Sequence, residues 1–131
     1  MPLPLRLTPA CLPKRGVGVA NKNIIVGGAG FIGSHLVDAL IEKENQVIVL
    51  DNFSTGRPQN LDHIKDKIQL IQCDISQAGQ WQNKFENVDN VFHLAALADI
   101  VPSIENPDTY YKSNVNGTFN VLEACRKHNV N

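Results

Sequence analysis

The sequence predicts an α/β fold in which a parallel sheet is covered by helices on both of its faces. From Asn23 onward, apolar runs typical of buried strands alternate with segments that have helical periodicity. Three glycines, Gly27, Gly30 and Gly33, fall where the first apolar run ends and the first helical segment begins. The chain has 131 residues, of which 43% are hydrophobic and 19% charged, as expected for one globular domain.

The glycine triplet has the spacing of a loop that holds the diphosphate of a dinucleotide. Gly27 permits a turn that a Cβ would obstruct, Gly30 lets a diphosphate approach the backbone, and Gly33 lets the next helix pack on the strand. The helix would then offer its unpaired N–H groups and the positive end of its dipole to the phosphates. Glycine turns also occur where nothing binds, so the spacing alone leaves a structural turn open.

An acidic residue, Asp51, ends the second apolar run, Val47–Leu50. A carboxylate at the end of the second strand can accept hydrogen bonds from the adenosine ribose hydroxyls, and it would repel a 2′-phosphate. The alternative is that Asp51 and Asn52 form a solvated turn. With the glycines, Asp51 favours a dinucleotide site that takes NAD.

The remaining elements follow in order. We expect strands at 23–27, 46–50, 68–72 and 90–94, and helices at 31–44, 59–66, 76–86 and 104–128. Ser103 and Pro107 are expected to mark the start of the last helix. The connection rules predict the strand order 3-2-1-4. The sequence therefore predicts a Rossmann-type, doubly wound parallel sheet that is truncated after about four strands and ends in a long helix.

Residues 1–22 differ from the rest, because they contain four prolines and no acidic residue. We expect a disordered or non-native extension there, and the N-terminal part of a dinucleotide-binding domain over 23–131. A net charge of −1 gives no basic surface for nucleic acid, and no apolar run approaches the roughly 20 residues of a membrane helix. The three widely spaced cysteines form neither a metal-binding nor a disulfide pattern. These features predict a cytoplasmic chain without nucleic-acid, membrane or metal partners.

Five motifs together resemble the extended short-chain dehydrogenase/reductase superfamily, and within it the NAD-dependent sugar-nucleotide epimerases and dehydratases. The UDP-glucose 4-epimerase branch is the nearest likeness. The resemblance runs from Asn23 to Asn131 and is carried by Gly27–Leu36, Asp51–Gly56, Cys73–Ile75, His93–Ala96 and Tyr110–Thr118. Val26 stands where the family usually has threonine.

The resemblance implies a role for each matching residue. The diphosphate would be held by Gly27, Gly30, Phe31, Ile32 and Gly33. Asp51 and Asn52 would hold the adenosine ribose, and Asp74 and Ile75 would hold the adenine. Ala95 and Ala96 would line the cofactor cleft, and Asn114 would brace the backbone near the nicotinamide half. The residues themselves also allow structural roles. Ala95 and Ala96 could be small packing residues, Asp74 could open the next helix, and His93 is most simply a core or strand-end histidine.

The family's catalytic serine or threonine and its Tyr-x-x-x-Lys motif are expected beyond Asn131. Tyr110 and Tyr111 are followed four places on by Asn114 and Val115, so no catalytic residue is assigned within the chain. The resemblance implies the NAD-binding portion of a nucleotide-sugar epimerase or dehydratase, not competent for turnover alone. A non-catalytic dinucleotide-binding module and a truncated gene product without activity are the alternatives.

The final helix bears one apolar face, formed by Tyr111, Val115, Phe119 and Leu122. The helix resembles the one that pairs in family dimers, which implies a homodimer of the intact enzyme. The same face could instead be buried against the sheet. Gly117, inside this helix, is expected to serve a close contact with another backbone or a cofactor, or to be merely tolerated.

Overall fold

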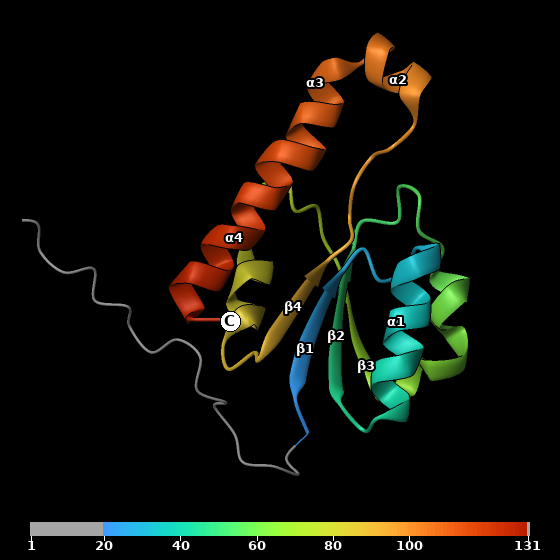
Figure 1. Ribbon diagram of the computed structural model, residues 1–131, viewed down its shortest axis with the longest axis vertical. Coiled ribbons are helices and arrows are strands. Elements are labelled where there is room, and N and C mark those ends of the chain that lie inside the picture. Colours follow the sequence, from blue (N-terminus) through green and yellow to red (C-terminus); the bar gives the residue numbers. More distant parts are fainter. Residues whose placement is uncertain (1–19, 131) are drawn as a thin grey trace, which may run out of the picture.

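The computed structural model describes residues 20–130, which form a four-stranded parallel sheet between two layers of helices (Figure 1). The strands are β1 (Lys22–Val26), β2 (Gln46–Asp51), β3 (Ile68–Gln72) and β4 (Asn90–His93). Their order is β3-β2-β1-β4 and every pairing is parallel, so the predicted fold class and strand order are confirmed. Most of the predicted 1–22 extension lies outside the described residues, although Lys22 already belongs to β1.

The sheet is apolar on both faces because helices cover both of them. On one face, Ile24 and Val26 of β1 pack with residues of η2 (Gln80–Phe85) and α4 (Gly117–His128). On the other face, Ile25 packs with residues of α1 (Phe31–Glu42) and η1 (Pro58–Lys67). Successive strand residues point to opposite faces, so one short strand contributes to both cores.

Two predicted helices differ from the structure. Residues 59–66 lie within a 3₁₀ helix, η1, and the helix predicted at 76–86 is a 3₁₀ helix that begins only at Gln80. Gly79 is fully extended, which delays the start of η2. Asp74 opens no helix; its Oδ1 accepts a hydrogen bond from Ser76 N in a local turn.

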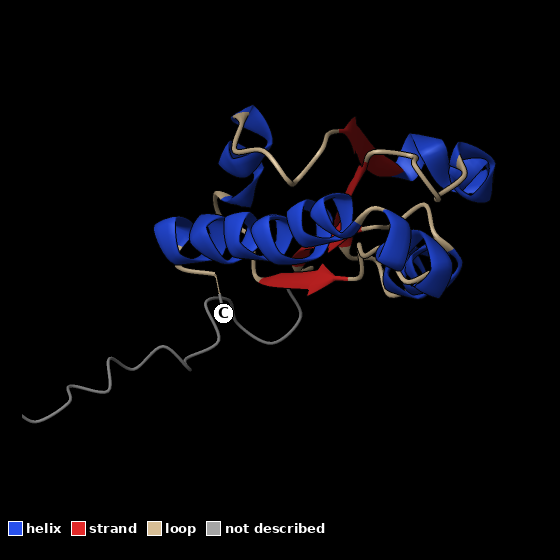
Figure 2. Ribbon diagram, turned by 90° about the horizontal axis from the view of Figure 1, so that it is seen from above, coloured by secondary structure: helices blue, strands red, loops and turns tan. Residues whose placement is uncertain are grey.

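The long final helix is interrupted near its start. Residues 100–105 form a separate helix, α2 (Ile100–Glu105), so the prediction that Ser103 marks a helix start is wrong. Pro107 does occupy the first turn of α3 (Pro107–Tyr110), which continues through a π-helical stretch, η3 (Tyr111–Asn116), into α4. These three elements form one continuous rod along the sheet (Figure 2).

The predicted apolar face of this rod points to solvent. Tyr111, Val115, Phe119 and Leu122 are 50–61% exposed, whereas Gly117, Val121 and Ala124 are buried. The alternative in which the predicted apolar face is buried against the sheet is therefore wrong. At Gly117, a Cβ would lie 3.0 Å from side-chain atoms of Ile75, so this glycine serves close packing against a side chain. None of the helices within residues 20–130 combines the length and apolar character needed to cross a bilayer.

A short hydrogen-bond chain ties β4 to the rod. His93 Nε2 lies 2.9 Å from Thr118 Oγ1, and the Thr118 hydroxyl donates to the carbonyl of Asn114. Because that hydroxyl hydrogen is already used, His93 must donate from Nε2, which leaves Nδ1 as an acceptor. Nδ1 is buried and has no partner among the described residues. Burial lowers the pKa of His93 below its ordinary value of 6.5.

Acidification should therefore destabilise the chain partly through His93. The folded-state pKa lies below the unfolded one, so His93 contributes its full stabilisation above pH 6.5 and loses it as the pH falls toward the folded-state pKa. Urea unfolding between about pH 7.5 and about pH 5 should show a steeper loss of stability in the wild type than in His93→Gln. The other histidines are common to both proteins, so an identical pH dependence would contradict the proposed cost of protonating Nδ1.

Candidate functional site

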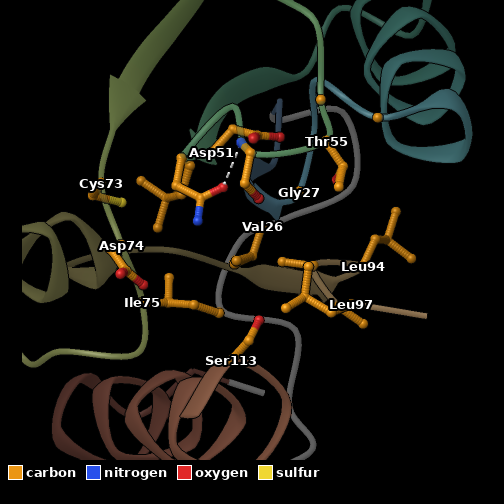
Figure 3. Close-up of a pocket in the computed structure, with 17 residues that line it drawn as sticks. Val26, Gly27, Asp51, Thr55, Cys73, Asp74, Ile75, Leu94, Leu97 and Ser113 are labelled. Atoms are coloured by element: carbon orange, nitrogen blue, oxygen red, sulfur yellow. Dashed lines mark hydrogen bonds between the residues drawn. The ribbon is translucent and has the colours of Figure 1, made fainter. Parts of the chain in front are cut away.

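A pocket lies at the carboxyl edge of the sheet, where the parallel strands end (Figure 3). After β1 the chain continues into α1, which covers one face of the sheet. After β4 it continues through α2 and α3 into α4, which covers the other face. This divergence of neighbouring strands is a topological switch point, where open α/β sheets bind their ligands. Most of the predicted site residues line the pocket: Gly27, Gly30, Asp51, Asn52, Asp74, Ile75, Ala95 and Ala96.

Four predicted residues do not line it: Phe31, Ile32, Gly33 and Asn114. At the start of α1, Phe31 and Ile32 expose 79% and 68% of their surface to solvent. Only their backbone N–H groups could therefore take part in binding a diphosphate. Asn114 accepts a hydrogen bond from Leu97 N and donates one to Leu97 O, each 2.8 Å long. Asn114 thus fixes the backbone of a residue that does line the pocket.

The glycine loop makes the turn from β1 to α1 at very close range. Gly27 has φ +85°, and a Cβ there would lie 2.7 Å from the backbone N of Ala95. A Cβ on Gly33 would collide with the carbonyl oxygen of Gly27, so Gly33 allows the helix to pack against the turn. At Gly30 the nearest atom to an added Cβ is Gly27 O at 3.5 Å, so the space beside Gly30 is open.

The start of α1 presents hydrogen-bond donors. Its first hydrogen bond runs from Ser34 N to Gly30 O, so the N–H groups of Phe31, Ile32 and Gly33 precede the first helical bond. Such donors, together with the positive end of the helix dipole, favour an anion. This end of the pocket is therefore suited to a phosphate or diphosphate.

Asp51 occupies the other side of the loop and is only 8% exposed, so it is not a residue of a solvated turn. Its Oδ2 accepts a hydrogen bond from Ala29 N at 2.9 Å, and its Oδ1 accepts one from Phe53 N at 2.8 Å. A carboxylate has about four lone-pair sites, so each oxygen can still accept a hydrogen bond from a ligand hydroxyl. Asp51 lines the pocket and presents a negative charge there.

The pocket wall also contains residues that the sequence analysis did not assign to it. Cys73 contacts the core and also lines the pocket. Burial, reinforced by the carboxylates of Asp51 and Asp74, raises the pKa of Cys73 to about 11, so its thiol stays neutral near pH 7. Ser113 lines the opposite wall from η3 (Figure 3). No spacing rule could find Ser113, because the π-helical stretch departs from the helical period.

These features suit one kind of ligand. Donors at the start of α1 match a diphosphate, the open space at Gly30 admits it, and the acceptor oxygens of Asp51 match a ribose diol. A second phosphate next to Asp51 would be repelled. The residues present therefore fit the adenosine diphosphate half of a dinucleotide without a 2′-phosphate.

Comparison with known proteins identifies related chains of three activities. UDP-glucuronic acid decarboxylase 1 of Arabidopsis thaliana is 40% identical over 85% of this chain and 26% of its own length. A dTDP-glucose 4,6-dehydratase of Mycobacterium tuberculosis is 36% identical over 82% of this chain and 33% of its own length. The crystal structure of the Thermus thermophilus UDP-glucose 4-epimerase in complex with NAD matches with a TM-score of 0.75, at 34% identity over 83% of this chain and 35% of that one.

The chain therefore spans about a third or less of the length of these relatives. The family model described as "NAD dependent epimerase/dehydratase family" matches residues 23–131, which is the whole sequence after the N-terminal segment 1–22. The residues that the family model matches include the glycine loop and all the residues that line the pocket. The chain belongs to the NAD-dependent epimerase/dehydratase family.

Proposed function

We propose that this chain is the NAD-binding part of an enzyme that acts on a nucleotide sugar. The observation that carries the proposal is the joint presence, in one pocket, of the glycine loop and the acceptor oxygens of Asp51. The names of the relatives support the substrate class, because they include a UDP-glucuronic acid decarboxylase and a dTDP-glucose dehydratase. The NAD complex of the Thermus thermophilus epimerase supports the cofactor.

Each part of the pocket has a defined task in this proposal. The N–H groups at the start of α1 and the space beside Gly30 hold the diphosphate, while Asp51 and Asn52 hold the adenosine ribose. Asp74 and Ile75 flank the adenine, and Ala95 and Ala96 line the cleft beyond β4. When bound, NAD would supply a hydride acceptor for oxidation of a sugar carbon. Proton transfer at the sugar is assigned to the family's Tyr-x-x-x-Lys pair, which this sequence does not contain.

The relatives include an epimerase, a dehydratase and a decarboxylase. The residues that line the pocket surround the expected position of the cofactor rather than that of the sugar. The proposal therefore names the substrate class, a nucleotide sugar, and the reaction type, transient oxidation of the sugar.

Titration with NAD and NADP tests the cofactor. Calorimetry on the full chain should show NAD binding, and NADP should bind about tenfold more weakly or worse, because its 2′-phosphate would face the carboxylate of Asp51. Equal or stronger binding of NADP would contradict the role given to Asp51. Absence of NAD binding at millimolar concentration would contradict the proposed function.

Two glycine variants separate binding from folding. Gly30→Ala should leave stability unchanged or slightly higher, because Gly30 has φ −74° and an added Cβ meets only ordinary contacts. The same methyl group would occupy the space proposed for the diphosphate, so the affinity for NAD should fall about tenfold or more.

Gly33→Ala is the matched contrast. Its Cβ would collide with the Gly27 carbonyl, so it should lower the free energy of unfolding by about 1–3 kcal/mol. Urea unfolding and NAD titration of both variants check this pair. Full NAD affinity in Gly30→Ala would show that the diphosphate lies elsewhere.

We also propose that the intact protein forms a homodimer through the exposed face of Tyr111, Val115, Phe119 and Leu122. Sedimentation velocity should detect a dimer that Phe119→Lys weakens, while thermal stability stays unchanged at concentrations where the chain is monomeric. Lys127→Glu, on the same helix but outside this face, is the control and should leave association unchanged. A wild type that stays monomeric up to millimolar concentration would contradict the proposal for this face.

A further inference from the structure

The backbone of Ala29, in the middle of the glycine loop, is held at both of its polar groups by the last residue of β2 and by the segment that follows β2. Ala29 N donates to Asp51 Oδ2 at 2.9 Å. Ala29 O accepts one hydrogen bond from Arg57 N at 3.0 Å and a second from the side-chain amide of Asn60 at 2.8 Å. Asn60 lies 31 positions along the chain from Ala29, so this contact depends on the tertiary fold.

These bonds fix the peptide plane between Ala29 and Gly30. Its carbonyl end is held by Arg57 and Asn60, and its amide end donates from Gly30 N to Gly27 O at 3.3 Å. A loop with three glycines in four residues has a large conformational entropy when it is free, so ordering it is unfavourable. Holding the plane before a ligand arrives removes part of that cost from the binding step.

The Ala29 carbonyl also matters for the donors at the start of α1. If α1 began one residue earlier, Ala29 O would accept a hydrogen bond from Gly33 N, four positions later in the chain. In the structure, the two bonds from Arg57 and Asn60 occupy this oxygen instead. The Gly33 N–H therefore lacks this acceptor within the helix and remains one of the donors at the start of α1.

We propose that Asn60 is a positioning residue for the diphosphate-binding loop, and this inference rests on the proposed function. Asn60 does not line the pocket, so it acts through the Ala29 carbonyl rather than on the cofactor. Asn60 is itself placed at the start of η1 by a hydrogen bond from its N–H to Arg57 O. The Arg57 contact is made by the main chain, so Asn60 is the side chain through which substitution can test this carbonyl contact.

The test compares three variants of the full chain with the wild type. Asn60→Asp keeps the shape but replaces the donor with an acceptor, and Asn60→Ala removes the donor without adding charge. Gln59→Glu is the matched control, because it adds the same negative charge at the neighbouring exposed position. Calorimetric titration with NAD and titration with adenosine followed by NMR give the two affinities. Thermal unfolding shows whether each variant is folded.

Loss of one hydrogen bond corresponds to about 0.5–1.5 kcal/mol, so both Asn60 variants should bind NAD about threefold to tenfold more weakly. Gln59→Glu should bind NAD like the wild type. Adenosine has no diphosphate, so its affinity should be the same in all four proteins.

Unchanged NAD affinity in both Asn60 variants would overturn the inference. An equal loss for NAD and adenosine would also overturn it, because Asn60 would then support the adenosine side or the whole fold. Failure of the wild type to bind NAD at all would instead refute the proposed function. The two failures are therefore distinguishable.

Discussion

The arrangement of the pocket depends on the carboxylate of Asp51. A buried carboxylate is stable only where donors surround it, and Asp51 receives the N–H groups of Ala29 and Phe53. The first bond ties the end of β2 to the glycine loop that follows β1. The second holds Phe53, whose φ of +58° is a left-handed conformation that costs a non-glycine residue about 1–2 kcal/mol. One side chain thus orders two loops on adjacent strands.

The sheet topology makes this contact possible. β1 lies between β2 and β4, so the glycine loop meets the exit loop of β2 on one side and the backbone of Ala95 on the other. Asn114 then fixes the backbone at Leu97, further along the same loop after β4. The pocket is therefore assembled where three strands end. The side chains of Asp51 and Asn114 hold the backbone of its loops, and Gly27 lets two of these loops approach closely.

The parts of the fold that depend on local pattern could be predicted from the sequence. Apolar runs identified the four strands to within one residue, and the glycine spacing together with Asp51 identified the edge of the sheet that bears the pocket. Contacts between distant segments could not be predicted in the same way. The bond from Asn60 to Ala29 and the place of Ser113 depend on how η1 and η3 pack, and helical spacing says nothing about either. The apolar face at Phe119 was identified correctly, but periodicity alone cannot say whether such a face meets the sheet or solvent.

Amide hydrogen exchange, followed residue by residue by NMR with and without NAD, tests the central role of Asp51 most directly. The hydrogen bond to Asp51 predicts that the Ala29 amide exchanges slowly even without ligand, while the amides of Phe31 and Ile32 exchange fast. On addition of NAD, Phe31 and Ile32 should become protected and Ala29 should change little. An Ala29 amide that exchanges as fast as Phe31 in the free chain would show that the carboxylate does not order the loop.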